Sequence, residues 1–360
     1  MAMTAQHDPV TPRQNQQDAP CEVAVSSEVP AWEDYLHARP DATIYHDPRW
    51  GRIMAEVYGN RPVYLTATRG GRTVGVLPLV RQRSLLFGSH LCSVPYFDAA
   101  GILADDEAAR RALAESARGL RSEHGAEWVE LRQLQPVDEA LPTRTDKVMM
   151  HLALPDNTDE LWKALRATVR NRVRKAEKAD LTAADGGREL VGEFYAVYSR
   201  NMRDLGSPPH GRRFFEAIAR EFEDSVRLFV VRHDREALAA SVTLSDRHAM
   251  RMPWAASDWR ARDLCPNMLL YWRMLAHACE TQAACFDFGR STRDEGTYRF
   301  KRRWGAEPVQ LYWHYLLPEG AEMPELRPDS RKYRLMVACW RKLPVWMARA
   351  IGPRIIAKLS

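Results

Sequence analysis

Long apolar runs are missing from this 360-residue chain. No segment approaches the ~18 apolar residues that a membrane-spanning helix requires. The first twenty residues are polar, and they lack the basic start and apolar core of a secretion signal. We therefore expect residues 1–20 to be a disordered leader and the protein to be cytoplasmic. The length favours two domains, and the 45% hydrophobic and 28% charged content is that of a globular protein.

Cysteine and histidine patterns typical of metal or disulfide sites are also missing. The six cysteines include no Cys-x-x-Cys pair, and the eleven histidines include no His-x-x-x-His pair. These absences argue against a zinc site and against a disulfide framework. We expect reduced thiols and no bound metal.

Basic charge is concentrated at one end. Residues 326–360 hold nine Lys or Arg and one acid, whereas residues 1–325 hold 43 bases and 46 acids. The chain thus has a strongly basic tail on a nearly neutral body.

Two segments repeat a similar order of predicted elements. In the first, a helix is followed by a hairpin with Gly70-Gly71 at its turn, a third strand, a helix and a strand. Their predicted ranges are 48–58, 63–68, 74–80, 84–91, 105–124 and 128–132. The second opens with three helices, which lead into three strands, a helix, a strand, a short helix and a last strand. Their predicted ranges are 158–179, 188–205, 212–222, 226–232, 238–245, 248–255, 267–282, 285–288, 294–304 and 309–315.

Helices that lead into an antiparallel meander, a helix and a further strand are the order of the GNAT acyltransferase fold. We therefore predict an α/β (α+β) protein with two tandem GNAT-like domains, each a mainly antiparallel sheet flanked by helices. The predicted domains are residues 21–152 and 153–320, followed by a basic amphipathic helical tail over 321–360.

The most informative motif is Phe286-Asp-Phe-Gly-Arg-Ser291, followed by Phe300-Lys-Arg-Arg-Trp-Gly-Ala306. An apolar strand, a polar turn and a short basic helix place a carboxylate, two or three cations and a tyrosine around one strand end: Asp287, Arg290, Arg293, Tyr298 and Lys301. Such a cluster suits an anionic substrate and the oxyanion of an acyl transfer. A buried ion pair between Asp287 and Arg290 is the structural alternative.

A basic stripe runs along the predicted helix 158–179, where Arg166, Arg170, Arg174 and Lys178 recur every four residues. The opposite face is apolar. The stripe predicts a surface for the phosphates of a nucleotide-linked sugar, a lipid diphosphate or transfer RNA. A solvated helix face is the alternative.

Two loops carry further candidates. In the loop that begins with Tyr96-Phe-Asp98, Asp98 could bind a substrate hydroxyl or amine and Tyr96 could stack on a sugar or base, or Asp98 could simply form a turn. In the rigid segment 205–211, His210 is either a base or hydrogen-bond donor at the site or an ordinary loop histidine.

One feature of many acetyl-CoA-dependent GNAT enzymes is absent. Their glycine-rich turn exposes backbone N–H groups to the pyrophosphate, whereas no glycine occurs between Arg212 and Phe288. The corresponding turn, 259–267, still ends at a helix N-terminus that could bind phosphate, but tight binding of CoA is not predicted.

These motifs resemble the FemAB-like transferases of the GNAT superfamily, and in particular the branch associated with exosortase/PEP-CTERM systems. The resemblance covers about residues 25–360. It is carried by the segments 170–178, 205–209, 266–272, 286–291 and 300–308, and by the tail segments 343–344 and 351–353.

The resemblance implies transfer of an activated acyl or aminoacyl group to an amine or hydroxyl of a peptidoglycan or exopolysaccharide precursor. It implies that Phe300 and Lys301 handle the acyl donor and the developing negative charge, and that Asp98 and Tyr96 line the acceptor site. No permanent cofactor is implied. The donor is a co-substrate, either aminoacyl-tRNA or an acyl group on CoA or acyl-carrier protein. The coiled-coil arm that Fem proteins often carry has no room between 158–179 and 188–205, so the donor stays open.

We expect the acceptor to attack the acyl carbonyl directly, with both substrates held between the domains. Lys301 and nearby backbone N–H groups would stabilise the oxyanion, and Asp287 or the substrate would receive the proton. The predicted catalytic residues are Lys301, Asp287 and Tyr298. The predicted substrate-binding residues are Tyr96, Asp98, Arg170, Arg174, Lys178, His210, Arg290 and Phe300.

The tail has apolar residues at helical spacing from Met336 to Ile351, with bases among them and a break expected at Pro344. Such a helix either lies on the anionic inner face of the membrane, near a lipid-linked precursor, or packs across the domain junction.

A second function class stays open. A non-catalytic GNAT-like protein could bind polysaccharide, a lipid carrier or RNA through the basic stripe and the tail. The missing glycine-rich turn favours this alternative, and the cluster of Asp287 and Lys301 opposes it.

Overall fold

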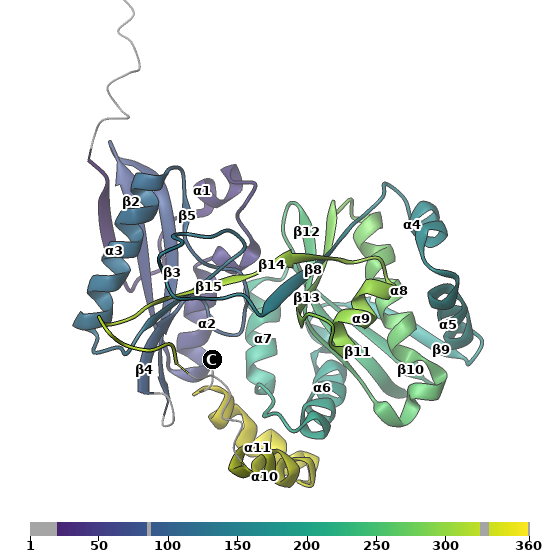
Figure 1. The fold of residues 1–360 in the computed structure, drawn as a ribbon. Coiled ribbons are helices and arrows are strands. Elements are labelled where there is room, and N and C mark those ends of the chain that lie inside the picture. Colours follow the sequence, from purple (N-terminus) through teal and green to yellow (C-terminus); the bar gives the residue numbers. More distant parts are fainter. Residues whose placement is uncertain (1–19, 85–87, 325–330, 359–360) are drawn as a thin grey trace, which may run out of the picture.

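The computed structural model describes residues 20–84, 88–324 and 331–358. They form two β-sheets side by side, with helices around them and a helical tail at one end (Figure 1). The predicted leader lies almost entirely outside the described residues, as do positions 325–330 of the predicted tail.

The first sheet has the strand order β1-β2-β3-β4-β6-β15-β7, with β5 paired to β3 at one side. Its strands are β1 (Glu22–Ser26), β2 (Arg61–Arg69), β3 (Arg72–Ser84), β4 (Gly88–Cys92), β5 (Leu103–Ala104), β6 (Val129–Gln133), β7 (Thr143–Arg144) and β15 (Tyr312–Leu316). Its helices are α1 (Glu33–Ala38), the 3₁₀ turn η2 (Ile44–His46), α2 (Arg49–Tyr58) and α3 (Glu107–Glu123).

The second sheet has the order β14-β8-β13-β12-β11-β10-β9. Its strands are β8 (Lys147–Ala153), β9 (Leu181–Gly186), β10 (Val226–His233), β11 (Glu236–Ser245), β12 (Ala249–Ser257), β13 (Cys285–Thr292) and β14 (Glu307–Gln310). Its helices are α4 (Thr158–Ala164), α5 (Ala167–Glu177), η3 (Arg188–Leu190), α6 (Val191–Leu205), α7 (Arg212–Glu221), η4 (Trp259–Leu264), α8 (Pro266–Glu280) and α9 (Gly296–Arg303). The tail consists of α10 (Arg331–Arg341) and α11 (Val345–Ile356).

The two sheets exchange a strand. β8 follows the strands of the first sheet in the chain, yet it lies between β13 and β14 of the second sheet. Conversely, β15 lies between β6 and β7 of the first sheet. The expected boundary between residues 152 and 153 therefore falls inside a strand, and the sheets interlock across it.

The prediction of a single strand over 309–315 is wrong. The structure has β14 and β15 there, and they belong to different sheets. The chain passes from one sheet to the other at Leu311, which is buried in a small core beside Trp313 and Met149.

Each sheet contains one parallel strand pair whose two strands are connected by a helix. β4 and β6 pair over Leu91–Cys92 and Val129–Glu130, with α3 between them in the chain. β12 and β13 pair over Ala249–Arg251 and Cys285–Asp287, with α8 between them. The paired stretches are short, and beyond them the strands diverge.

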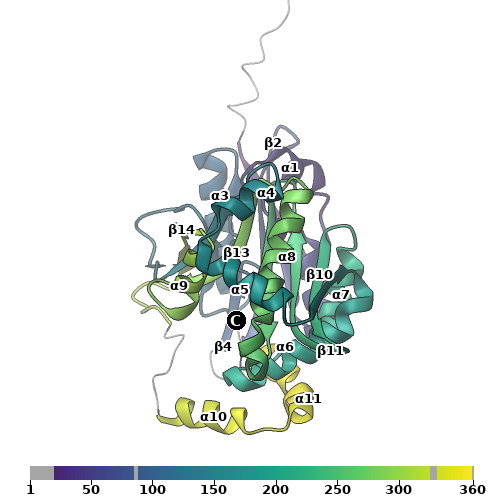
Figure 2. The ribbon, with the colours of Figure 1, turned by 90° about the vertical axis from the view of Figure 1, so that its right-hand side faces the viewer.

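One of the hydrophobic cores contains residues from both halves of the molecule. Trp50 and Ile53 of α2 pack in the same cluster as Phe214 and Ile218 of α7, while α6 covers one face of the second sheet. The opposite face of that sheet is covered by α8 and α5. Figure 2 shows α8 and α5 in front of the sheet.

The predicted helix 158–179 is two helices. Leu165 and Arg166 have extended backbone, with ψ of 142° and 141°, which ends α4 before α5 begins. Val169, Val173 and Ala176 are buried, so the predicted apolar face is correct.

The tail forms two helices separated at Pro344, as its sequence predicts. No helix in the described part of the chain is both long and apolar enough to span a membrane.

Candidate functional site

The candidate site lies where β12 and β13 diverge. On β12, Met252 and Pro253 together stand opposite one residue of β11, which is a bulge. On β13, Phe288 and Gly289 form a second bulge opposite β8. Gly289 has φ of +74°, a conformation that glycine adopts readily. The two bulges open the sheet just after Asp287, and we call this place the fork.

Asp287 is a buried carboxylate with three partners. Its Oδ1 accepts from the Gly289 N–H at 2.7 Å, and its Oδ2 lies 3.3 Å from Arg251 Nη1 and 3.6 Å from His151 Nε2. Burial by itself would raise the pKa of Asp287, but these partners hold it below its usual value. The group at the fork is therefore a fixed negative charge.

Lys301 reaches the fork from α9. Its buried ammonium donates to the carbonyl oxygens of Gly289 at 2.9 Å and Arg290 at 2.8 Å. An ammonium has three N–H donors, so two hydrogen bonds leave one for another partner. Burial lowers the pKa of Lys301 to about 8. The side chain thus lies beside β13 with one donor that has no acceptor among the residues the structure describes.

Arg290 connects the fork to the first half. Its guanidinium forms an ion pair with Asp98 at 2.9 Å and lies 5.0 Å from the ring centre of Trp313 on β15. Arg132 lies over the same ring at 4.3 Å and donates to the carbonyl of Phe97. Asp98 and Arg290, which the sequence predicts at one site, are therefore in contact. The alternative of an ion pair between Asp287 and Arg290 is wrong, because Asp287 pairs with Arg251.

A cavity of about 260 Å³ opens beside the carboxylate, and we call it the His151 pocket. His151 and Arg251 line it from the second sheet, and Thr43, Arg132 and Gln133 line it from the first half. Because His151 also faces Asp287, one imidazole connects this pocket to the fork.

A second cavity, of about 280 Å³, lies between α9 and the first turns of α5 and α8, and we call it the Arg172 pocket. It is lined by three arginines and by apolar and polar neighbours: Arg166, Arg172, Arg303, Thr168, Val169, Met268, Phe300 and Trp304. Thr168 and Met268 belong to the first turns of α5 and α8, so the positive ends of two helix dipoles also point there. The chemistry of the pocket favours an anion with an apolar portion.

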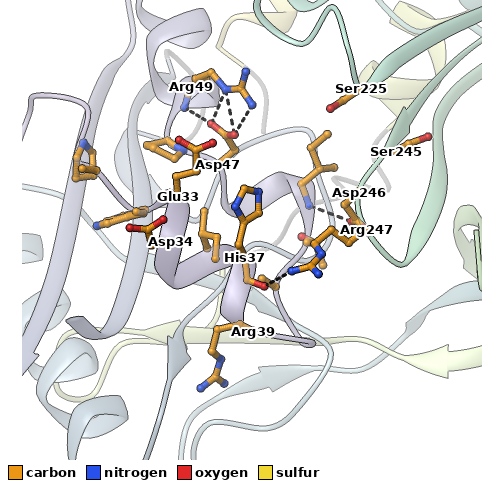
Figure 3. Close-up of a pocket in the computed structure, with 18 of the residues that line it drawn as sticks. Glu33, Asp34, His37, Arg39, Asp47, Arg49, Ser225, Ser245, Asp246 and Arg247 are labelled. Atoms are coloured by element: carbon orange, nitrogen blue, oxygen red, sulfur yellow. Dashed lines mark hydrogen bonds and ion pairs between the residues drawn. The ribbon is translucent and has the colours of Figure 1, made fainter. Parts of the chain in front are cut away.

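A third cavity, of about 800 Å³, lies between α1, the start of α2 and the turns at 224–225 and 245–248 (Figure 3). Several of its charged side chains already have partners. Asp47 holds Arg49, and Arg247 donates to the carbonyl of His37 at 2.8 Å. None of the predicted site residues lines it. Asp246, at the edge of this cavity, forms an ion pair with Arg251. Arg251 also pairs with Asp287, so it connects this cavity to the fork.

Tyr96 and His210 do not lie at the fork. The ring of His210 stacks on Phe214 at 4.6 Å and contacts Tyr96 edge-to-face, and its Nδ1 lies 2.6 Å from the Tyr58 hydroxyl. Burial lowers the pKa of His210 to about 3. The Tyr96 hydroxyl donates to the carbonyl of Ile356 in α11 at 3.0 Å. Both side chains thus form a packed aromatic cluster beneath the tail, where no face of Tyr96 is presented to the fork.

The remaining predicted site residues line the Arg172 pocket, pack against a core or lie on the outside of α5. Phe300 lines the Arg172 pocket. Tyr298 packs against the second core and its hydroxyl forms no hydrogen bond within the described chain. Arg170 donates to the Lys163 carbonyl, Arg174 lies over Trp162 at 5.5 Å, and Lys178 is exposed. The stripe therefore covers the outside of α5, and its Arg166 end is the part that reaches the pocket.

Sequence reasoning missed several residues of the site. His151 and Arg251 at the fork, and Arg172 and Arg303 at the pocket, were not among the candidates. A strand that carries His151 could have been predicted, because Lys147–Ala153 is a short apolar run with one histidine and is followed by Pro155. In the described part of the chain, no group of three or more His, Cys, Asp or Glu is placed to hold a metal ion.

Comparison with known proteins agrees with this architecture. Residues 163–302 match the family described as acetyltransferase (GNAT) domain. These residues include most of the second sheet, α8, Asp287 and Lys301. A search of curated proteins found no match.

Among solved structures, FemX superposes with a TM-score of 0.64 at 16% identity, covering 81% of this chain and 96% of FemX. L-PGS from Bacillus licheniformis has a TM-score of 0.53 at 12% identity, with 86% and 95% of the two chains covered. The C-terminal domain of a candidate lysylphosphatidylglycerol synthetase from Agrobacterium fabrum has a TM-score of 0.50 at 14% identity, covering 73% and 87%. At these identities the likeness is one of fold, and it confirms the prediction that this chain has two GNAT-like units in tandem.

Proposed function

We propose that the protein is an acyltransferase of the Fem type, which moves an activated acyl or aminoacyl group to an amine or hydroxyl of a cell-envelope precursor. The observation that carries the proposal is Lys301, a buried ammonium with one unused donor beside the strand fork of a GNAT-like sheet. A positive donor in a buried place is what an oxyanion requires. The match of residues 163–302 to the GNAT domain supports this reaction class.

Two pockets support a reaction with two substrates: one is lined by His151, which faces Asp287, and the other is lined by Phe300, the chain neighbour of Lys301. We assign the acyl donor to the Arg172 pocket, whose three arginines suit a phosphate-bearing donor, whether aminoacyl-tRNA or an acyl group on CoA or acyl-carrier protein. We assign the acceptor to the His151 pocket. The donor is a co-substrate, and no permanent cofactor is part of the proposal.

The chemistry follows from the contacts of Asp287. Because its pKa is held low, Asp287 is a weak base and serves to orient His151, to which we assign the role of general base. The acceptor nitrogen or oxygen attacks the acyl carbonyl while His151 takes its proton. Lys301 stabilises the oxyanion. The bond from the acyl carbon to the donor oxygen or sulfur then breaks, and the leaving group takes the proton from His151.

We propose the class of acceptor from the resemblance of this chain to other proteins. FemX and L-PGS share the fold, and the sequence motifs resemble the exosortase/PEP-CTERM-associated branch of FemAB-like proteins. We therefore propose a peptidoglycan or exopolysaccharide precursor, lipid-linked or nucleotide-linked, as acceptor.

The first experiment offers the purified protein pools of acyl-CoA, acyl-carrier protein and aminoacyl-tRNA, and detects binding and transfer by mass spectrometry. Transfer to lipid-linked or amino-sugar acceptors supports an enzyme and identifies the donor class. Binding of donors or acceptors with no transfer from any donor would favour a non-catalytic binding protein.

The second experiment replaces the unused donor. Lys301→Met should lower kcat by about 100-fold or more, since an oxyanion-hole donor is lost. Thermal unfolding and circular dichroism check that the variant is folded. Lys175→Met, at an exposed lysine of α5, is the matched control and should keep full activity. Unchanged turnover in Lys301→Met would exclude the assignment of Lys301.

A further inference from the structure

The tail helices have a packed face and an exposed face. On the packed face, Arg203 donates to the carbonyl of Leu343 at 2.7 Å, and Arg349 donates to the Ser199 hydroxyl at 2.8 Å. Gly352 lies so close to Pro209 that a Cβ there would be 2.5 Å from a ring carbon. The tail is therefore fixed to α6 and to the segment 207–210.

The exposed face carries large apolar side chains. Trp346 is 69% exposed, Leu335 is 65% exposed and Met336 is 61% exposed. Further apolar members of this face are Ile351, Ile355 and Leu205, the last of which ends α6 beside Arg341. So many large apolar side chains on two adjacent helices are unusual for a face that meets only water.

Positive charge surrounds these side chains. Residues 331–358 contain eight Lys or Arg and no Asp or Glu. Lys342, Arg354 and Lys358 are exposed and form no ion pair within the described chain. The face thus combines apolar anchors with uncompensated cations.

The two helices also have a suitable arrangement. In Figure 2, α10 and α11 lie across one end of the molecule, and α10 extends along that end away from the body. A helix that binds a membrane surface lies in the plane of the interface, with apolar side chains among the acyl chains and cations at the headgroups.

We propose that the face formed by Leu205, Leu335, Met336, Trp346, Ile351 and Ile355, together with Lys342, Arg354 and Lys358, docks on an anionic lipid bilayer. Charge complementarity selects anionic headgroups, and the apolar side chains distinguish a bilayer from a nucleic acid, which would be held by the cations alone. Because one face of the tail packs on the protein and the other is exposed, the tail can pack on the body and bind a membrane at the same time. These are the two roles that its sequence predicts.

The tail is also connected to the candidate site through the first half of the molecule. The carbonyl of Ile356 accepts from Tyr96, and Tyr96 lies two residues before Asp98 in the loop that reaches Arg290. The loop therefore runs from the packed side of the tail to the ion pair beside the fork. The inference does not depend on the proposed function, because a docked protein could act on any substrate.

The test is flotation of the full-length protein with vesicles of phosphatidylcholine, with and without phosphatidylglycerol, at low and high salt. Removing the tail would uncover α6, so point variants at exposed positions are preferable. The apolar variant is Leu335→Ser with Met336→Ser and Trp346→Ser. The charge variant is Lys342→Gln with Arg354→Gln and Lys358→Gln. Val25→Ser, at an exposed valine of β1 in the first sheet, is the control.

We expect wild type and the control to float with anionic vesicles, and the apolar variant to bind at least about tenfold more weakly. The charge variant should lose most of the difference between anionic and neutral vesicles. Flotation that is equal for wild type and both variants would overturn the proposal. Binding to RNA but not to vesicles would also overturn it, and would identify the face as a nucleic-acid surface.

Discussion

Asp98 and Arg290 form an ion pair, with 2.9 Å between Oδ1 and Nη1, that joins the first half of the molecule to strand β13 of the second. The carbonyl oxygen of Arg290 also accepts from Lys301. The pair therefore connects the loop of the first half directly to the residue that positions the Lys301 ammonium.

Double-mutant analysis can measure this connection. We expect Asp98→Asn and Arg290→Gln to be coupled by about 0.5–1 kcal/mol in the free energy of unfolding, because Arg290 is 41% exposed and water screens the pair. Urea unfolding of the two single variants and the double variant provides the value. The exposed pair of Glu107 and Arg110 on α3 is a reference within the same protein. Additive effects of the two substitutions would show that the pair does not hold the halves together.

The pKa of Lys301 predicts a pH dependence of transfer. Burial lowers this pKa to about 8, so the ammonium form that donates to an oxyanion predominates below that pH and is lost above it. The rate of the chemical step should therefore fall as pH rises through about 8. Single-turnover rates across this range are the measurement. In Lys301→Arg, whose guanidinium does not lose its proton, the same decline should be absent, and a decline that persists would point to another group.

The Arg172 pocket and the outer stripe of α5 can be separated by mutation. Arg172→Gln should raise the KM for the acyl donor by about tenfold and leave the KM for the acceptor unchanged, since a charge-assisted contact to phosphate is lost. Lys178→Gln, on the exposed end of the same helix, is the matched control and should change neither value. The opposite result, with Lys178 sensitive and Arg172 not, would restore the stripe as the binding surface.

Buried histidines predict that the fold weakens in acid. Burial lowers the pKa of His46 to about 4 and that of His210 to about 3, whereas an unfolded histidine takes up its proton near its ordinary value. The unfolded state thus binds more protons below about pH 6.5, and stability falls as pH decreases toward 4. Each histidine should contribute about 1 kcal/mol per pH unit in this window.

Urea unfolding at neutral and acidic pH tests this dependence. His210→Gln should reduce the slope of stability against pH, although it also lowers stability at neutral pH. His248→Gln, at an exposed histidine, should leave the slope unchanged. A variant of His210 with the slope of wild type would show that this imidazole is not kept neutral by the fold.

Most elements with a strong local pattern could be predicted from the sequence. Gly70 and Gly71 both have positive φ, as the hairpin between β2 and β3 requires. Asp106 accepts from the N–H of Ala109 at the start of α3, close to the predicted beginning. Such patterns depend on residues that are close together in the chain, so they can be recognised without knowledge of the fold.

The strand exchange could not be predicted. Strand pairing between distant segments depends on sheet edges that no local pattern describes. No strand was predicted over Lys147–Ala153, which lies between the last predicted strand of the first segment and the first predicted helix of the second. His151 was missed for the same reason, since only the pairing of β8 with β13 brings it close to Asp287.

The structure brings together part of the predicted set of site residues. Asp287, Arg290, Lys301 and Asp98 meet at or beside the fork, because β13 and α9 follow each other closely in the chain and the first half contributes one loop. Arg251 was not predicted as the partner of Asp287, since β12 joins β13 only through the parallel pairing in the sheet. Tyr96 and His210 looked available in the sequence, but the tail covers the cluster that contains them.

The exchanged strands also have a consequence for synthesis on the ribosome. β6 ends at Gln133, and its partner β15 begins at Tyr312. At ordinary elongation rates the nascent chain carries β6 with an open edge for on the order of ten seconds or more, while nearly the whole second half is made. During that time the first sheet is incomplete and its edge is available to other strands. Conditions that slow translation between these two strands should therefore lower the yield of folded protein more than equal delays after residue 316.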